Sequence, residues 1–377
     1  MKILHVIYDD IENPWVGGGG ASRALEINRL LAKKHSITML TGNFPGAKSG
    51  RINGINFVRI GFEKHYFLSR LTFTLLIPFY LRKFDSELVV NDFSVFSPVF
   101  CHWFIRKPVI HTFYHSIGRQ AFKKFWILGV FAFLFEKIFL ATAQNIITIS
   151  PSVTQQIVRK NDKRRIECIF TGVDSALFDV DPAPKRSFVT KRDKGEYIAF
   201  LGRLDIYMKG LDVLIESFHK LSDKAVTLKI AGSGPKKNRD KIEQLINKYR
   251  LSSRVQLLGR ISDKEKKEFL QQAAFVVMPS RFEGWGIAAI EAAACGRAVI
   301  GTNIPGLQDS VIAGKTGLLI EPNNPEVLAD AMRTLLHDEN LCTSLGMNAR
   351  SWAKSFTWDV IAEKQEAFYK EILTRNN

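Results

Sequence analysis

The sequence is poor in cysteine and has no long apolar run, and each absence excludes a class of protein. Only four cysteines occur in 377 residues, with no C-x-x-C pair among them: Cys101, Cys168, Cys295 and Cys342. We therefore expect neither a disulfide framework nor structural zinc, and a reducing cytoplasm is the default compartment. The most apolar stretch, residues 125–135, is interrupted by Glu136 and Lys137. It falls well short of the roughly 20 residues of a membrane-spanning helix.

Three short patterns are also missing. We expect no signal peptide, because the apolar-leaning residues after Lys2 give way to Asp9 and Asp10 before a signal h-region can form. No G-x-G-x-x-G directly follows the first expected strand, which argues against a dinucleotide-binding turn. Asp179-Val-Asp181 has D-x-D spacing but stands in a proline-bounded segment. We interpret that pair as structural, so no metal site is predicted.

What the sequence does have is an uneven excess of positive charge. The formal net charge is +16. Residues 1–190 hold 25 Lys+Arg and 14 Asp+Glu, a net +11, together with 21 of the 28 Phe, whereas residues 191–377 hold 28 and 23, a net +5. A basic and Phe-rich first half predicts an anionic partner with an apolar component. A membrane surface fits that description better than nucleic acid does.

Short apolar runs alternate with helical patterns along the chain, which is typical of parallel α/β architecture. We expect strands in the first half at residues 3–8, 37–41, 56–60, 88–91, 109–112 and 145–149. We expect strands in the second half at residues 197–201, 226–231, 255–258, 275–278, 298–302 and 317–320. Two doubly wound domains follow, spanning residues 1–180 and 181–356, with the boundary in the Pro-containing segment 179–186. A final helix within 357–377 is expected to pack back on the first domain.

The most informative segment runs from the strand at 275–278 into a loop and a helix that contains many alanines. Glu283 precedes that helix, which starts near Gly284–Gly286, and Glu291 lies about two turns inside it. Unpaired backbone amides at a helix start form an anion site, and carboxylates accept hydrogen bonds from paired sugar hydroxyls. Alanines flank Glu291 on both sides, which predicts a buried carboxylate that needs a partner. The alternative is a solvated helix glutamate beside an unrelated loop glutamate.

A second set of residues follows the strand at 197–201. Arg203 stands just past its end, where open α/β sheets bind ligands, and Lys209 precedes the helix 211–219. A cation opposes the dipole at a helix start unless an anion is bound there, so the pair predicts a diphosphate clamp. Two surface basic residues are the plainer alternative. Ser233, in the glycine turn 231–235, either lines a nucleotide or belongs to a turn alone.

A run of four glycines, Gly17–Gly20, separates the strand at 3–8 from a helix at about 22–34. Glycine lets the backbone approach a ligand closely and adopt positive φ. A lone glycine loop is a weak signal, so Gly18 and Gly19 are candidate ligand contacts only in the context of the other segments.

In order along the chain, these residues resemble the retaining glycosyltransferases with two facing Rossmann-like domains, the GT-B fold, and an E-x7-E motif. The resemblance runs through nearly the whole sequence, at these segments: Gly17–Gly20, Thr171–Asp174, Gly202-Arg203 with Lys209-Gly210, Glu283 to Glu291, Cys295–Ile300, Thr316–Ile320 and Phe356–Trp358. Motif order is specific for the family and much less so for its substrates.

The resemblance implies a role for each candidate. Glu283 would bind donor-sugar hydroxyls, Glu291 the ribose, and Arg203 with Lys209 the diphosphate leaving group. The remaining implied donor-binding candidates are Gly18, Gly19, Ser233, Arg260, Gly284, Trp285, Gly286 and Ile287. Members of the family generally transfer a sugar from a nucleotide diphosphate with retention and without a metal or other cofactor. A leaving-group phosphate oxygen then helps deprotonate the acceptor hydroxyl, so stabilising charge on the diphosphate becomes the main catalytic task.

The family usually has a histidine after the strand that here ends near residue 112, facing the reacting centre. Counting from Pro108 places that position on Tyr114, and a shift of one residue places it on His115. We favour His115 as this catalytic residue and His111 as the second choice. An ordinary packed or surface role is the alternative for each histidine.

Two segments of the first half, residues 62–84 and 119–139, mix bulky apolar side chains with Lys and Arg. They predict a peripheral enzyme on the cytoplasmic face of an anionic membrane, although two core helices would give a similar pattern. The function that follows is hexose transfer from a nucleotide sugar to a lipid-linked or cell-envelope glycan acceptor. A soluble small-molecule acceptor is the first alternative, and a dinucleotide-dependent epimerase or oxidoreductase is the second. Nucleic acid is not an expected partner.

Overall fold

The computed structural model describes residues 1–116, 120–179, 197–221 and 225–376. The chain divides into two compact units, each described here by itself. The first comprises Met1–Thr171 and Trp358–Asn377, and the second comprises Gly172–Thr357. Each unit has its own sheet, so the prediction of two separate α/β domains is confirmed. Most of the expected boundary segment, residues 180–186, lies outside the described residues.

Residues 172–179 group with the second unit, whereas the sequence placed them with the first. Hydrogen bonds explain the difference. The Val173 amide donates to the Phe356 carbonyl, and the Cys295 thiol lies 3.6 Å from the Leu177 carbonyl that accepts from it. These contacts join residues 172–179 to two later parts of the second unit, one near Cys295 and one at Phe356.

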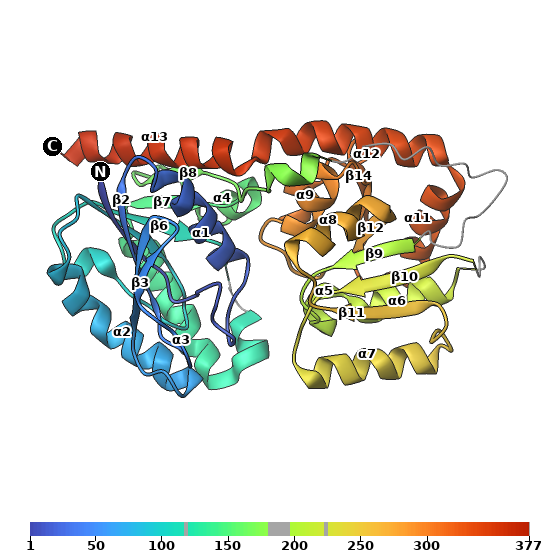
Figure 1. The fold of residues 1–377 in the computed structure, drawn as a ribbon, viewed down its shortest axis with the longest axis horizontal. Coiled ribbons are helices and arrows are strands. Elements are labelled where there is room, and N and C mark those ends of the chain that lie inside the picture. The colour runs from blue at the N-terminus through green and yellow to red at the C-terminus, as the bar shows by residue number, and fades with distance from the viewer. Residues whose placement is uncertain (117–119, 180–196, 222–224, 377) are drawn as a thin grey trace. The chain divides into compact units, whose positions relative to one another are not determined.

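The first unit is built on an eight-stranded sheet in the order β3-β4-β2-β1-β5-β6-β7-β8 (Figure 1). Its strands are β1 (Lys2–Val6), β2 (Ser36–Gly42), β3 (Gly50–Ile52), β4 (Ile55–Ile60), β5 (Leu88–Asp92), β6 (Val109–Phe113), β7 (Asn145–Thr148) and β8 (Arg165–Cys168). The pairs are parallel except for β3 with β4. The six expected strands are present. The sequence analysis missed the two outermost strands, β3 and β8, and one of them makes the sheet mixed.

Helices cover both faces of this sheet. They are α1 (Gly19–Leu31), α2 (Tyr66–Lys83), α3 (Gln120–Thr142), α4 (Pro151–Ile157) and α13 (Trp358–Asn376), with the 3₁₀ turn η1 (Cys101–Trp103). On one face, Ile27 of α1 and Tyr369 of α13 share a core with Ile110 of β6. The C-terminal helix therefore packs on the first unit.

The other face carries α2 and α3. Phe73, Ile77 and Leu81 of α2 share a core with Val109 of β6. Phe113, on the same side of β6 as Val109 because side chains alternate along a strand, stacks on Phe139 of α3. Both helices thus lie on one side of the sheet (Figure 1).

The second unit has a six-stranded parallel sheet in the order β11-β10-β9-β12-β13-β14. Its strands are β9 (Tyr197–Leu201), β10 (Thr227–Ala231), β11 (Val255–Gly259), β12 (Ala273–Met278), β13 (Val299–Thr302) and β14 (Gly317–Ile320), all six at the expected places. Its helices are α5 (Ile206–Lys209), α6 (Leu211–His219), α7 (Lys236–Lys248), α8 (Asp263–Gln272), α9 (Ile287–Ala294), α10 (Leu307–Ser310), α11 (Pro325–His337) and α12 (Glu339–Ala353). Two 3₁₀ turns complete it, η2 (Ser175–Phe178) and η3 (Lys354–Phe356).

Local sequence accounts for several of these helix starts. Ser262 and Glu265 form a reciprocal capping box at α8, which satisfies two otherwise unpaired amides. Asn324 caps α11 and Pro325 is its first residue, the position where a missing N–H costs least. β12 is apolar and buried throughout, as expected for a central strand covered on both faces.

Candidate active site

Four neighbouring strands of the second sheet end at one edge with polar residues. Arg203, Ser233 and Arg260 follow the glycines that end β9, β10 and β11, and Ser280 follows β12 closely. Parallel strands bring their carboxyl ends to the same edge, where open α/β sheets bind ligands. The structure therefore brings Arg203, Ser233 and Arg260 to one edge, as the sequence predicted for Arg203.

The two arginines at this edge are exposed. Among the described residues, neither Arg203 nor Arg260 makes a side-chain hydrogen bond or ion pair with the protein. A guanidinium in that state is available to an anion, and its planar fork suits a phosphate group.

Glycine is required at position 232, where β10 ends. The Gly202 amide donates to the Ala231 carbonyl at 3.0 Å, and the Gly232 amide donates to the Gly259 carbonyl at 2.7 Å. Gly232 has a φ of +146°, and a Cβ there would stand 1.8 Å from the Gly202 carbonyl oxygen. No other residue fits such a contact, so the strand ends carrying Arg203 and Ser233 are held close together.

Lys209 and Glu283 form the central contact of the site. The Lys209 ammonium donates a hydrogen bond to Oε1 of Glu283. Ser280 Oγ donates to the same oxygen at 3.1 Å. The two charged side chains are 18% and 11% exposed, so this ion pair is shielded from water while its rim stays accessible. The sequence placed both residues in the site separately and did not predict their contact.

Backbone packing brings Lys209 to this position. Asp205 caps the short helix α5 by accepting from the Met208 amide at 3.0 Å. Gly210 then takes a φ of +63°, and a Cβ there would lie 2.0 Å from the Pro279 carbonyl oxygen. The β9–α6 connection therefore sits directly on the β12–α9 loop.

Arg281 ties the same two loops together from its side of the contact. Its amide donates to the Met208 carbonyl at 2.9 Å, and its guanidinium forms a bidentate ion pair with Asp212 at 2.9 Å for both bonds. Neither Arg281 nor Asp212 was singled out in the sequence, because no local pattern shows that a strand-end arginine meets a helix on another connection.

The helix α9 begins at the expected place. Gly286 is its N-cap, with a φ of +80° and no capping side chain, and no acidic residue occupies the first turn. The amides at the start of α9 have no acceptor within the helix, which makes the end attractive to an anion. Trp285 is buried and packs edge-to-face on Phe356 with ring centroids 5.1 Å apart. Its indole serves packing, so only the backbone of Trp285 can contribute to a donor site.

Glu291 lies four residues after Ile287, the first residue of α9, which is one turn into the helix rather than the two expected. Its Oε1 accepts from the Lys266 ammonium at 2.7 Å. Burial raises the pKa of Glu291 above its ordinary value, and the nearby Lys266 partly opposes that rise. The expectation of a buried, paired carboxylate is confirmed, but Lys266 was not identified from the sequence.

The remaining candidates, Gly18, Gly19 and His115, belong to the first unit. Gly18 is the N-cap of α1 and Gly19 its first residue. A Cβ at Gly18 would meet no atom within 4 Å, so the backbone there faces open space. His115 is exposed and follows β6 by two residues.

Tyr114, beside His115, is held in the first unit. Its hydroxyl donates to Asp92 at 2.6 Å, and burial raises the pKa of that phenol well above its ordinary value. The Asp92 carboxylate also lies 3.1 Å from Nε2 of His5. Burial raises the pKa of Asp92, but the His5 imidazole and the hydrogen bonds lower it further, so the net shift is downward. Direct counting placed the family's histidine position on residue 114. That residue is a tyrosine whose hydroxyl is hydrogen-bonded to Asp92.

His111, the second choice, is a buried histidine. Its Nδ1 is 3.1 Å from the Asn91 side chain, and its Nε2 is 3.1 Å from Nδ1 of His102. Burial first, and the neighbouring His102 second, lower the pKa of His111 to about 3. These contacts give His111 a packing role in the sheet interior.

In the part of the chain that the structure describes, no group of three or more His, Cys, Asp or Glu side chains is placed to hold a metal ion.

Comparison with known proteins connects both units to one enzyme class. Residues 183–352 match the family model described as glycosyl transferases group 1, and residues 17–177 match the model described as Glycosyltransferase Family 4. The chain is a glycosyltransferase with the GT-B fold, and its second unit matches the group 1 model. The dinucleotide-dependent epimerase or oxidoreductase considered above is therefore set aside.

Three curated relatives share between 25% and 32% of their aligned residues with this glycosyltransferase. It is 32% identical to the uncharacterized glycosyltransferase MJ1178 of Methanocaldococcus jannaschii over 63% of this chain and 62% of that relative. It is 25% identical to MJ1607 of the same organism over 98% of both chains. It is 31% identical to D-inositol 3-phosphate glycosyltransferase of Corynebacterium glutamicum, over 57% of this chain and 54% of the relative. Matches to the first and third of these thus span about half to three-fifths of the relative's length.

Solved structures share the fold of the glycosyltransferase. Sucrose-phosphate synthase from Thermosynechococcus elongatus superposes with a TM-score of 0.84, at 23% identity and full coverage of both chains. Anabaena Alr3699/HepE in complex with UDP-glucose superposes with a TM-score of 0.78, at 17% identity, over 98% of this chain and 100% of that chain. At these identities the likeness establishes the fold.

Proposed function

We propose that this glycosyltransferase moves a hexose from a nucleotide-diphosphate sugar to its acceptor with retention of anomeric configuration and without a metal ion. The observation that carries the proposal is the contact of Lys209 with Glu283 at the sheet edge where the exposed Arg203 side chain has no partner among the described residues. A cation paired with a carboxylate beside a free guanidinium suits a substrate that carries both hydroxyls and a diphosphate.

In the proposed reaction, the donor binds along the carboxyl edge of the second sheet. Lys209 and Arg203 hold the diphosphate, Arg260, Ser233 and the start of α9 assist them, and Glu283 accepts hydrogen bonds from donor-sugar hydroxyls. A phosphate would draw the Lys209 ammonium toward itself and free Oε1 of Glu283 for the sugar. The contact between Lys209 and Glu283 therefore holds both side chains close to their working positions.

Bond changes in this proposal balance without a carboxylate nucleophile. The bond between the anomeric carbon and the phosphate oxygen breaks, and a bond from the acceptor oxygen to the same carbon forms on the same face. The acceptor proton passes to an oxygen of the leaving phosphate. Arg203 and Lys209 stabilise the charge that develops on the diphosphate, which is the largest catalytic contribution expected of the protein.

Support for a uridine nucleotide comes from the fold neighbour HepE, which has been solved with UDP-glucose. Thermal-shift screening of UDP-, GDP- and ADP-sugars tests the donor class, followed by product analysis with a cell lipid extract. NMR of the product linkage distinguishes retention from inversion, and EDTA tests the metal. Inverted product, or activity abolished by EDTA and restored by a divalent ion, would contradict the mechanism.

For the acceptor, we propose a lipid-linked or cell-envelope glycan presented at an anionic membrane surface. The support is a concentration of exposed apolar side chains on one side of the first unit. Thirteen of the eighteen large apolar residues exposed in the described part of the chain lie between residues 62 and 134, and three lie in the second unit. We call the following set the apolar face: Phe62, Phe67, Leu68, Leu71, Leu75, Leu76, Phe79, Phe96, Trp103, Leu128, Val130, Phe131 and Leu134.

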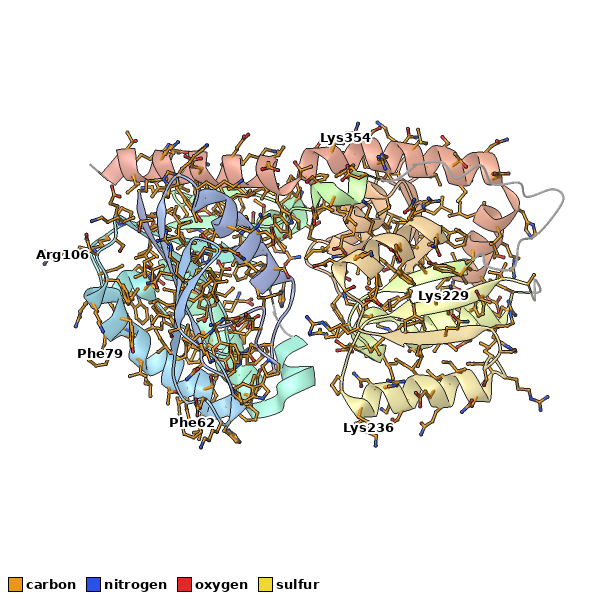
Figure 2. The ribbon with its side chains drawn as sticks, in the orientation of Figure 1. Phe62, Phe79, Arg106, Lys229, Lys236 and Lys354 are labelled. Atoms are coloured by element: carbon orange, nitrogen blue, oxygen red, sulfur yellow. The ribbon has the colours of Figure 1, made fainter. Side chains whose placement is uncertain are left out.

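The helix α2 shows why this surface is unusual. One side of α2 is buried through Phe73 and Ile77, and the opposite side exposes Phe67 and Phe79, the latter by 69%. Figure 2 shows Phe79 and Phe62 at the outside of the first unit. A helix that is apolar on both sides is normally buried or lies in a membrane interface.

Cations flank the apolar face. The exposed basic residues around it are Lys64, Arg82, Lys83, Arg106 and Lys137. Of the nearby exposed acidic residues, Glu63 precedes Lys64 in the chain and Asp85 is paired with Lys2. Exposed apolar side chains can enter a membrane interface while neighbouring basic residues bind its anionic headgroups. The combination therefore fits an anionic lipid surface better than it fits a protein partner. In the described part of the chain, no helix combines the length and the apolar character needed to cross a bilayer, so the proposed attachment is peripheral, on the cytoplasmic face.

A soluble small-molecule acceptor is the second candidate. The observation that favours it is the match to the D-inositol 3-phosphate glycosyltransferase of Corynebacterium glutamicum, whose named acceptor is a small polar phosphate. Product formation from inositol phosphate in the absence of lipid, with no product from the lipid extract, would decide for that alternative.

A further inference from the structure

Among the described residues, the mostly buried carboxylate of Glu291 has one side-chain partner, and that partner lies on a different helix. The Lys266 ammonium, on α8, is 2.7 Å from Oε1 of Glu291 on α9. No described residue donates a hydrogen bond to Oε2 of Glu291. The Glu291 side chain is 15% exposed, so a ligand can reach the carboxylate although most of the side chain is buried.

Few other charges surround the pair, and several are unfavourable for the carboxylate. On α8, Asp263 lies 3.0 Å from the Lys266 ammonium. Asp174, just before η2, and Asp263 both raise the pKa of Glu291, and the thiol of Cys295 lies at the end of α9. Lys266 is thus the group that offsets both the burial and these two carboxylates.

In the part of the chain that the structure describes, the remaining elements around α9 supply no other partner for Glu291. Arg350 of α12 faces the far end of the helix, where it donates to the Ala294 carbonyl at 3.1 Å. β12 and β13 contain no titratable side chain, and the acidic residue of α10 is Asp309. Arg297, two residues after Cys295, is buried, and its positive charge lowers the pKa of the Cys295 thiol.

We infer that Lys266 is a positioning residue for donor binding: it holds Oε1 of Glu291 and keeps the carboxylate ionised, so that Oε2 accepts from the ribose hydroxyls of the nucleotide. This inference rests on the proposed function, which gives Glu291 the ribose. A buried carboxylate that loses its cation takes up a proton instead of remaining charged. A protonated carboxyl is a weaker acceptor and points a donor at one of the hydroxyls.

Positioning the Glu291 carboxylate for nucleotide binding differs from only stabilising the fold. Removing one member of a shielded ion pair always costs stability, so a loss of stability in a Lys266 variant would not by itself support the inference. A shift in the pH dependence of nucleotide binding would, because only the ionisation of Glu291 links pH to the ribose contact.

The test uses calorimetric binding of UDP, GDP and ADP to the full chain between pH 5.5 and 8.5. The variants are Lys266→Gln, Lys266→Arg and Glu291→Gln. Lys264→Gln is the matched control, because Lys264 is an exposed lysine on the same helix and its loss removes the same charge. Circular dichroism confirms that each variant is folded before binding is measured.

We expect Lys266→Gln to bind the preferred nucleotide at least about tenfold more weakly at pH 6, because the buried carboxyl of Glu291 is then largely protonated without its cation. Binding should recover as the pH rises toward 8.5, whereas Lys264→Gln and Lys266→Arg should follow the wild type. A uniform loss at all pH values, or no loss in Lys266→Gln, would overturn the inference. Undiminished binding by Glu291→Gln would instead contradict the ribose role in the proposed function, as would a wild type that binds none of the three nucleotides.

Discussion

The ammonium of Lys209 donates to the carboxylate of Glu283 across a separation of 74 residues in the chain. Lys209 ends the short helix α5 and Glu283 lies in the loop between β12 and α9, and Gly210 packs against Pro279 to bring the two connections together. A pair of opposite charges is thereby held at the carboxyl edge of the second sheet, beside the exposed Arg203. Lys209 and Glu283 therefore offset each other's charge, whereas Arg203 stays exposed.

Replacing Glu283 by Gln should abolish most of the transfer while leaving the fold intact. Glutamine cannot accept two hydroxyl donors as a carboxylate does, and it no longer balances Lys209. We expect kcat/KM to fall at least about a hundredfold, measured with the donor found by screening. Glu326→Gln is the control, since Glu326 belongs to an exposed ion pair with Lys220 that should contribute little. Equal activity of Glu283→Gln and wild type would refute the assignment.

Lys209→Met should weaken nucleotide-diphosphate binding by about tenfold to a hundredfold, because it removes a charge-assisted contact with the phosphates. Calorimetry with the nucleoside diphosphate gives the affinity directly. Binding of the corresponding nucleoside, which lacks phosphates, should change much less. Lys220→Met serves as the control, because that lysine is paired with Glu326 instead. A similar loss in both variants would point to a general charge effect and not to a phosphate contact.

Gly210→Ala should destabilise the enzyme more than Gly314→Ala does. Both glycines have a φ near +65°, but a Cβ at Gly210 would stand 2.0 Å from the Pro279 carbonyl oxygen, whereas one at Gly314 meets nothing within 4 Å. The backbone conformation alone costs about 1 kcal/mol, so urea unfolding should show about that loss for Gly314→Ala and at least about twice it for Gly210→Ala. Activity should fall only in Gly210→Ala, because its loop carries Lys209. Equal losses of stability would show that the close contact relaxes freely.

The stability of the first unit should decrease in acid because of His111. Its pKa is lowered from 6.5 to about 3 in the folded chain, so the unfolded state binds the proton more tightly. The contribution is complete above pH 6.5 and is lost progressively as the pH falls toward 3. Between pH 7.5 and 5 the loss should reach about 2 kcal/mol. Urea unfolding of the wild type and His111→Gln at both pH values measures it, and an equally steep loss in the variant would disprove the attribution.

Attachment of the apolar face to membranes can be measured by co-sedimentation with anionic vesicles at low salt. A variant carrying Phe67→Ser, Leu71→Ser and Phe79→Ser should bind at least about tenfold more weakly than wild type, because three exposed apolar side chains no longer enter the interface. A variant carrying Val158→Ser and Met347→Ser, two exposed apolar residues outside that face, is the control. Absence of wild-type binding at low salt would eliminate the membrane proposal. Binding unaffected by the triple change would show that another surface attaches.

Local sequence predicted the strand positions well, and its failures have identifiable causes. The hairpin of β3 and β4 turns at Asn53-Gly54, where both residues have positive φ. Asn-Gly is a strong hairpin signal, so β3 could have been found from the sequence. β8 is short, half-buried and alternates charged with apolar residues, a pattern too brief to stand out.

The candidate site was predicted residue by residue but not as a set of contacts. Glycine and strand-end positions placed Arg203 and Glu283 at the correct edge, because parallel strands end together. Lys266 could not be found, because it is one of several lysines on a polar helix and only the packing of α8 on α9 turns it toward Glu291. The same holds for Tyr114, whose bond to Asp92 joins the ends of two strands.

The sequence by itself determined the two α/β units, the order of their elements and the residue types at the edge of the second sheet. These depend on periodicity and on short motifs, which are local. Tertiary structure alone decided that Lys209 pairs with Glu283 and Lys266 with Glu291, because each pair joins separate connections of the sheet. It also decided which side of α2 is buried. Apolar residues occupy both sides of that helix, so only packing against the sheet could leave Phe67 and Phe79 exposed.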